Sequence, residues 1–120
     1  MTKNTGSIPF HEKAAIYILS RGIEELGTLS AGAVAEALGV PLPKLLKTFA
    51  AHQHITLDRF IMREKIHRAI FTIDKDHAVS LESLSGKLGF KRMDEFETQF
   101  RNYLHIAPHL YKEIRRSKGL

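Results

Sequence analysis

The sequence contains no cysteine and no tryptophan, and it has no long apolar run. Without cysteine the chain can form no disulfide, no thiol nucleophile and no Cys-ligated metal site, which fits a reducing compartment. No stretch approaches the roughly 18 apolar residues that a membrane-spanning helix needs. The N-terminal residues MTKNTGSIPF also lack the apolar segment of a secretory signal. We therefore expect a cytoplasmic protein that does not contact a membrane.

Motifs of catalysis and of metal binding are missing as well. The sequence has no Gly-rich phosphate loop, no G-x-S-x-G elbow and no H-E-x-x-H pair. His52 with His54, and His105 with His109, each offer only two imidazole nitrogens, without a carboxylate in a standard ligand pattern. We expect no enzymatic activity, no metal site and no cofactor.

The alternating apolar pattern of β-strands is also absent, and apolar residues recur instead at helical spacing. Ile16, Leu19, Ile23 and Leu26, for example, share the spacing of one helix. The sequence predicts an all-α fold of about seven helices. Their expected places are residues 11–26, residues 31–38, a stretch opened by Pro43, residues 57–73, residues 80–88, a stretch around Phe96 and Phe100, and a last helix opened by Pro108.

The chain repeats itself. SAGAVAEALGV (30–40) matches SLESLSGKLGF (80–90) at an offset of 50. Both copies begin with a serine in the N-cap position, and both have a glycine as their second-to-last residue, where it suits a left-handed helix end. After one inserted residue the offset becomes 51, and the pairs are Leu45 with Phe96, Phe49 with Phe100, His54 with His105, and Phe60 with Tyr111.

Each copy is a short helix, a glycine turn and a longer helix, which is the pattern of a helix-turn-helix. Ala35 and Ser85 provide the small residue where the two helices approach. The second helix of such a unit presents its N-terminal half outward, where it can enter a major groove of DNA. The expected boundaries are a flexible N-terminal arm at 1–10, a first helix-turn-helix subdomain at 11–55, a linker helix at 56–75 and a second helix-turn-helix subdomain at 76–120.

The net charge of +5 is unevenly distributed. The first 40 residues carry three Lys or Arg against four Asp or Glu, whereas the remaining 80 carry fifteen against nine. A basic balance favours a polyanionic partner such as nucleic acid, although it also serves solubility.

The segments VAEALGV, LLKTF, ITLDRF, LESLSGKLGF, FETQF and IAPHLYKEIRR together resemble the DNA-binding domain of the AraC family of bacterial transcription regulators. The resemblance covers almost the whole chain, from residue 11 to residue 116. It implies a bilobal seven-helix domain whose two recognition helices enter adjacent major-groove segments of double-stranded DNA, with a long central helix between them. The residues that carry the most specific part are Gly89, Phe90, Phe96, Phe100, Pro108 and Tyr111.

The same resemblance implies which residues face DNA. On the first recognition helix the exposed positions are Pro43, Lys44, Leu46 and Lys47. On the second they are Arg92, Met93, Asp94, Glu97 and Thr98. Apart from the resemblance, the cations Lys91, Arg92 and Arg101 flank the acidic cluster, where they can hold phosphates.

Three features depart from the family pattern. The first recognition helix begins with Pro-Leu-Pro in place of a Ser or Thr followed by small polar residues. His54 and His105 stand where the family usually has glycine, before its closing motif. The second recognition helix carries Asp94 and Glu97 where small polar residues and an Arg are common.

The candidate residues allow more than one interpretation. Lys47 can donate to guanine or to a phosphate, or it can serve solubility alone. Asp94 or Glu97 can accept a hydrogen bond from cytosine, but a carboxylate in the first helical turn also favours the helix dipole. The basic residues of the linker helix and of the C-terminal tail fit local ion pairs and a solvated surface as well as contacts to the DNA backbone.

Two hypotheses follow from these observations. The leading one is a sequence-specific DNA-binding transcription regulator of the AraC type. The alternative is a protein-interaction module that keeps the fold, binds DNA weakly and acts through RNA polymerase or another regulator. The sequence leaves the oligomeric state open, and a monomeric domain is compatible with both hypotheses.

Overall fold

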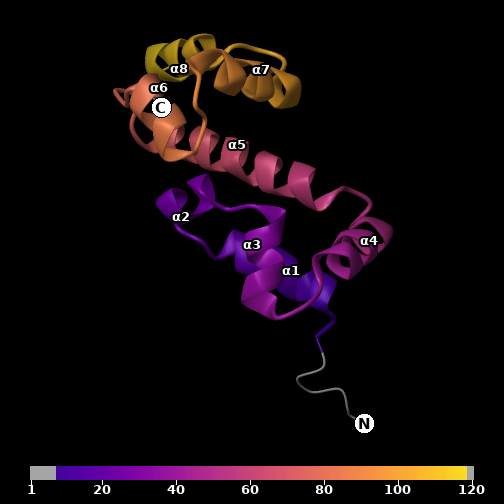
Figure 1. Cartoon of the computed structure of the whole chain (residues 1–120). Coiled ribbons are helices and arrows are strands. Elements are labelled where there is room, and N and C mark those ends of the chain that lie inside the picture. Colours follow the sequence, from indigo (N-terminus) through magenta and orange to yellow (C-terminus); the bar gives the residue numbers. More distant parts are fainter. Residues whose placement is uncertain (1–7, 119–120) are drawn as a thin grey trace. The chain divides into compact units, whose positions relative to one another are not determined.

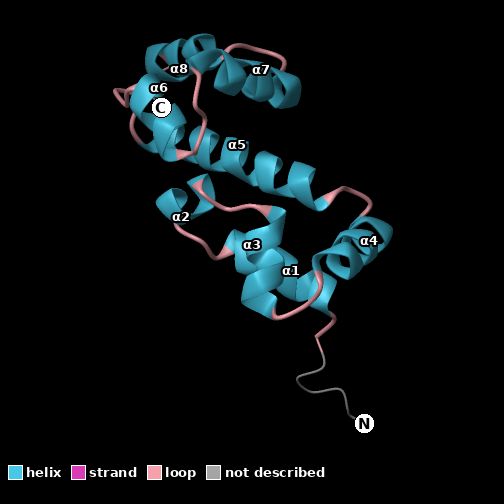
Figure 2. Cartoon of the chain, in the orientation of Figure 1, coloured by secondary structure: helices cyan, strands magenta, loops and turns pink. Residues whose placement is uncertain are grey.

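The computed structural model describes residues 8–118, so most of the predicted arm at residues 1–10 lies outside the described part of the chain. Within residues 8–118 the structure contains helices and loops but no strand (Figure 1, Figure 2). The predicted all-α fold is therefore confirmed. The helices are α1 (Phe10–Leu19), α2 (Ile23–Gly27), α3 (Ala31–Leu38), α4 (Leu42–Gln53), α5 (Leu57–Lys75), α6 (Leu81–Lys87), α7 (Met93–Leu104) and α8 (Pro108–Ser117).

The helices form two compact units. Unit 1 comprises the described residues up to Arg21 and residues Leu29–Ile61, which gives it α1, α3, α4 and the first turn of α5. Unit 2 comprises Gly22–Thr28 and the chain from Met62 onward, which gives it α2, the remainder of α5, and α6 to α8.

The core of unit 1 forms where α1, α3 and α4 pack on one another. Ile18, Val34, Leu45 and Phe49 are fully buried there, one or two from each helix. The ring of Phe49 meets Phe60 of α5 edge to face, with 5.3 Å between the ring centroids. Because these residues occupy the inner side of α4, its opposite side faces solvent.

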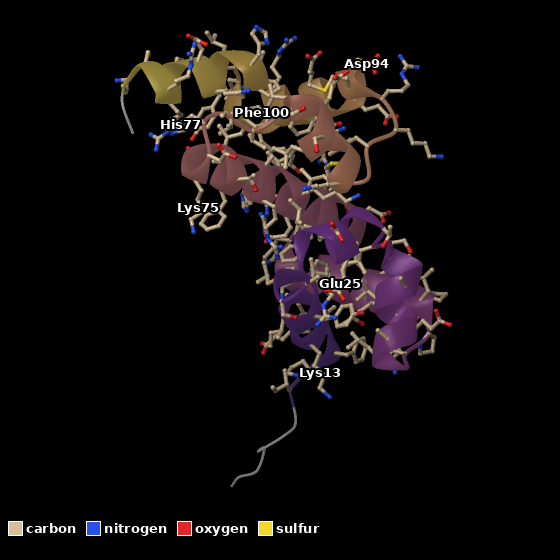
Figure 3. The ribbon with its side chains drawn as sticks, turned by 90° about the vertical axis from the view of Figure 1, so that its left-hand side faces the viewer. Lys13, Glu25, Lys75, His77, Asp94 and Phe100 are labelled. Atoms are coloured by element: carbon tan, nitrogen blue, oxygen red, sulfur yellow. The ribbon has the colours of Figure 1, made fainter. Side chains whose placement is uncertain are left out.

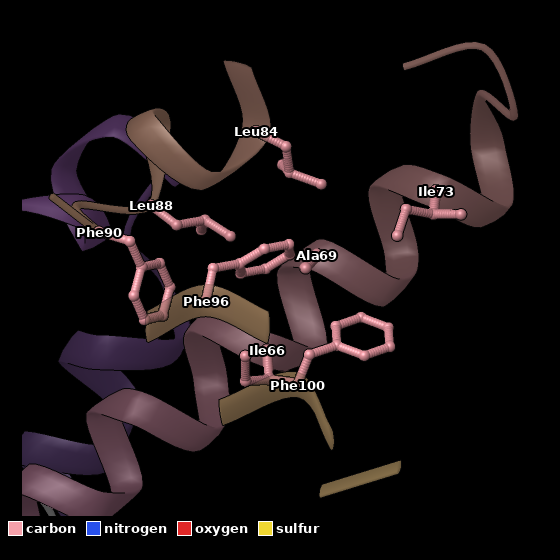
Figure 4. Close-up of a cluster of buried hydrophobic side chains, with 8 residues drawn as sticks. All are labelled: Ile66, Ala69, Ile73, Leu84, Leu88, Phe90, Phe96 and Phe100. Carbon is pink, nitrogen blue, oxygen red and sulfur yellow. The ribbon is translucent and has the colours of Figure 1, made fainter. Parts of the chain in front are cut away.

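The core of unit 2 is richer in aromatic residues. Phe96 and Phe100 of α7 are fully buried, and they link Phe90 and Tyr111 into a chain of ring contacts with centroid distances of 5.4 to 5.8 Å. Figure 4 shows the buried cluster converging from α5, α6 and α7. Its members are Ile66, Ala69, Ile73, Leu84, Leu88, Phe90, Phe96 and Phe100.

The helix predicted over residues 11–26 is in fact two helices, and this expectation was wrong. α1 ends at Leu19, where the Ser20 hydroxyl and the Arg21 guanidinium both donate to the carbonyl of Tyr17. Gly22 then starts α2, with its N–H donating to the Glu25 carboxylate at 3.1 Å. The buried residues of α1 are Ala14 and Ile18, not Ile16 and Leu19, which are about half exposed.

The internal repeat is visible in the helix boundaries. α4 and α7 begin and end at an offset of 51, and so do the starts of α5 and α8. Ser30 and Ser80 cap α3 and α6 in the same way, each accepting a hydrogen bond from the backbone N–H three residues on. The two units thus present equivalent helices, α4 and α7, as the second helix of each helix-turn-helix.

Candidate nucleic-acid interface

The predicted residues of the first recognition helix lie on the solvent side of α4. Pro43, Lys44, Leu46 and Lys47 are all exposed, whereas Leu45 between them is fully buried. Pro43 stands in the first helical turn, where its missing N–H leaves no hydrogen bond unmade. The exposed side therefore offers a leucine side chain and two lysines, without any carboxylate from α4 itself.

The start of α1 supports α4 from one flank. The ammonium group of Lys44 lies 5.8 Å from the centroid of the Phe10 ring. The imidazoles of His11 and His52 stack with 4.4 Å between centroids and 6° between planes, and the Gln53 amide contacts His11 Nδ1 at 2.9 Å. These contacts join both ends of α4 to the first turn of α1.

The predicted residues of the second recognition helix are only partly exposed. Lys91, Arg92, Asp94, Thr98 and Arg101 lie at the surface. Figure 3 shows Asp94 at the periphery of unit 2 and Phe100 within it.

Met93 and Glu97 are half-buried, and Met93 packs against the hydrophobic cluster. They lie closer to the inner side of α7 and offer less surface to a partner than the exposed residues Arg92, Asp94 and Thr98.

An ion pair occupies the beginning of α7. Arg92 is the N-cap residue, and its Nε donates to Asp94 Oδ1 at 3.0 Å while its Nη2 donates to Oδ2. The hydrogen bonds from Arg92 lower the pKa of the Asp94 carboxyl, and the same hydrogen bonds raise the pKa of the Arg92 guanidinium. Asp94 is therefore an ionised carboxylate paired with Arg92, and the pairing favours one orientation of the arginine side chain.

A hollow of about 510 Å³ opens beside this ion pair in unit 2. Of its charged lining residues, Lys65 was not expected here, because the basic residues of the linker helix, Lys65 among them, were interpreted as a solvated surface. Burial lowers the pKa of the Lys65 ammonium, which lies 5.8 Å from the Phe90 ring centroid. The lining residues are Met62, Lys65, Gly89, Phe90, Arg92, Asp94, Glu95, Thr98 and Gln99.

The helical spacing of α5 could have indicated that Lys65 is partly buried. It follows Met62 by three residues and precedes Ala69 by four, so it borders the apolar stripe of α5.

Several basic residues outside α4 and α7 have partners within the chain. Arg68 pairs with Glu64 at 2.9 Å, which confirms a local ion pair on α5. Lys112 donates to the carbonyl of Val79 at 2.6 Å, and Arg115 lies 2.9 Å from Asp74. The tail lysine and arginine thus hold α8 in place, and they are less available to a polyanion than their charge suggests.

Residues 8–118 bring together no group of three or more His, Cys, Asp or Glu side chains that could hold a metal ion. His54 and His105, which belong to the two histidine pairs considered above, instead terminate α4 and α7. Within the same residues, no helix is both long and apolar enough to cross a membrane.

Comparison with solved structures assigns the fold. The domain of a transcriptional regulator from Chromobacterium violaceum, described as AraC-type, superposes with a TM-score of 0.78 over 93% of this chain and 96% of its own, at 21% identity. The C-terminal domain of the response regulator AraT from Geobacillus stearothermophilus gives 0.78 over 89% and 86%, at 18% identity. This chain has the AraC-type fold.

A DNA-binding transcriptional dual regulator from Escherichia coli K-12 shares the same AraC-type fold, with a TM-score of 0.76 over 96% of this chain and 99% of its own, at 17% identity. No protein-family model matches the sequence, and no curated relative matches it. At these identities the likeness establishes the fold alone.

Proposed function

We propose that this chain is the DNA-binding domain of a transcription regulator, and that α4 and α7 each enter a major groove of double-stranded DNA. The AraC-type fold supports this proposal, since the solved structures that share it are described as regulators or DNA-binding domains. The observation that carries it is the repeat, which gives α4 and α7 the same length and the same place in their units.

The exposed chemistry of α4 suits a major groove. Lys47 can donate to guanine O6 and N7 or to a phosphate, and Leu46 can contact a thymine methyl group. Both side chains are exposed and lie on one side of the helix, with the buried Leu45 and Phe49 behind them. The prolines that begin α4 do not interfere, because a helix N-terminus has backbone N–H groups to spare.

A salt titration against random-sequence duplex tests the proposal. A DNA-binding domain loses affinity steeply as salt rises, because each neutralised phosphate releases counterions. Binding that stays near background at low salt contradicts the proposal and favours a protein-interaction module with the same fold.

The assigned faces predict unequal effects of two substitutions. Lys47→Ala removes a cation from the exposed side of α4 and should weaken binding to random duplex several-fold. Glu95→Ala removes an exposed carboxylate of α7 and should leave binding unchanged or strengthen it. Fluorescence anisotropy on one labelled duplex measures both variants, and equal losses from the two would contradict the assignment.

A further inference from the structure

We infer that Arg92, oriented by Asp94, is a guanine-reading residue of α7, and that Asp94 is a positioning residue for it. This inference rests on the proposed function and goes beyond it, because it assigns base preference to two named side chains. It also explains how a recognition helix can carry a carboxylate in its first turn.

The pairing with Asp94 leaves part of the Arg92 guanidinium free to donate hydrogen bonds. A guanidinium group has five N–H donors in a planar fork. Asp94 accepts one from Nε and one from Nη2. Three N–H groups remain, one on Nη2 and two on Nη1, and they lie at the end of the side chain. Nη1 and Nη2 together form the bidentate donor that fits O6 and N7 of guanine.

The free end of the Arg92 side chain is accessible to solvent. The Arg92 side chain is 72% exposed and the Asp94 side chain 60% exposed, so the free end of the guanidinium is open to a partner. Both residues line the hollow beside α7, together with Thr98 one helical turn further on. Because the pairing with Asp94 favours one orientation of the long side chain, less conformational freedom is lost on binding.

The charges of the pair favour a base over a phosphate as the group that the Arg92 guanidinium contacts. The Arg92–Asp94 pair carries no net charge, so it gains little from a phosphate, and its carboxylate is repelled there. The major-groove edge of guanine is uncharged and offers two acceptors, which suit the three remaining donors. Glu95 offers a contrast, because it attracts Arg92 only through space and does not fix its orientation.

The test compares variants of the 120-residue chain in selection from a random duplex library. Anisotropy is then measured on the selected duplex and on versions changed at one base pair. We expect the wild-type motif to contain a guanine whose preference is lost in Arg92→Ala, with the other positions kept. The discrimination at that position should fall by about 5- to 150-fold.

Asp94→Ala should separate positioning from general attraction. We expect it to weaken the preference for that guanine while affinity for random duplex rises, because a carboxylate near the phosphates is removed. Glu95→Ala is the matched control: it removes a neighbouring carboxylate and should raise random-duplex affinity without changing the guanine preference. Thermal melting by circular dichroism checks that each variant folds.

A guanine preference that is unchanged in Asp94→Ala overturns the positioning role of Asp94. An unchanged motif in Arg92→Ala, or a loss of affinity that is uniform across all sequences, overturns the inference and leaves the proposed function standing. A wild-type chain that binds duplex with steep salt dependence but selects no guanine at any position covered by α7 also overturns it. A wild-type chain that shows no salt-dependent binding at all fails the proposed function itself.

Discussion

His54 and His105 have a backbone conformation that residues with a Cβ seldom adopt. Their φ angles are 60° and 65°, and each residue ends one of the two equivalent helices, α4 and α7. The left-handed region brings Cβ close to the backbone, which costs an ordinary residue about 1–2 kcal/mol. Glycine avoids this cost, which accounts physically for the glycine that the family pattern prefers there.

His105→Gly should therefore stabilise the protein by about 1 kcal/mol, after allowance for the extra freedom of glycine in the unfolded chain. Urea unfolding followed by circular dichroism measures the change in the free energy of unfolding. His109→Gly is the control, because His109 lies in the first turn of α8, where glycine relieves no left-handed strain and only adds freedom to the unfolded chain. A loss of stability in His105→Gly would mean that the imidazole makes a stabilising contact at the helix end.

The Arg92–Asp94 ion pair could not be predicted from the spacing of the two residues in the sequence. Residues two apart do not face each other on a helix, so periodicity rules argue against the pair. It forms because Arg92 is the N-cap residue, whose extended backbone leaves the helical path. The exposure of Arg92 and Asp94 was predictable from the resemblance, whereas their pairing depends on side-chain geometry that spacing does not encode.

Among the helices, the two glycine turns look alike in sequence but differ in their surroundings. Gly39 and Gly89 both have positive φ, at 70° and 88°. A Cβ on Gly39 would meet nothing within 4 Å, whereas a Cβ on Gly89 would lie 1.9 Å from the carbonyl oxygen of Gly27. The backbone of Gly27, which ends α2, thus touches the turn that follows α6.

Gly89→Ala should destabilise the protein by about 3 kcal/mol, because strain at positive φ adds to a clash between two backbones. Gly39→Ala meets only the strain and should cost about 1–2 kcal/mol. Urea unfolding of both variants gives the comparison directly. Equal costs would show that the contact between α2 and the α6 turn contributes nothing to stability.

The helix ends were predicted where their signals are local, as at Ser30, Gly39 and Ser80. The division of residues 11–26 was not, because Gly22 lies within an apolar spacing that continues on both sides. The helix breaks near Gly22 because its two halves pack on different partners. α2 packs on α6 in unit 2, whereas α1 packs on α3 and α4 in unit 1. Contacts between residues distant in sequence therefore determine that residues 11–26 form two helices, and helical spacing alone cannot reveal such contacts.

Polar contacts fasten α8 to the end of α5. The Tyr111 hydroxyl donates to Asp74 at 2.7 Å. Burial and this hydrogen bond raise the pKa of Tyr111 above its ordinary value of 10.0. A raised folded-state pKa contributes stability that is fully present below the unfolded pKa and is lost as pH rises through the folded pKa.

Tyr111→Phe should consequently cost about 1 kcal/mol of stability at neutral pH, through the lost hydrogen bond. The difference between wild type and variant should shrink above pH 10, because phenylalanine does not ionise whereas the tyrosinate next to Asp74 would be repelled. Urea unfolding at neutral and at alkaline pH measures both differences. A gap that stays constant with pH would contradict the role of the Asp74 hydrogen bond.

For the attraction of the whole molecule to DNA, the net charge of +5 matters less than which cations lack a carboxylate partner. Lys112 and Arg115 hold α8, and Arg92 is neutralised by Asp94. The exposed lysines of α4 have no carboxylate from their own helix beside them. On this basis α4 should supply more of the general attraction for DNA, and α7 more of the base preference.

The double variant Lys44→Ala/Lys47→Ala tests this division. If both ammonium groups neutralise phosphates, the slope of log affinity against log salt should become shallower by about 1.8, or about 0.9 for each lost contact. Anisotropy of random duplex at a series of salt concentrations gives the slope. Lys13→Ala, at an exposed lysine of α1, should leave the slope unchanged and serves as the control. If the double variant keeps the wild-type slope, the lysines of α4 do not contact phosphates, and the cations around α7 must supply the attraction.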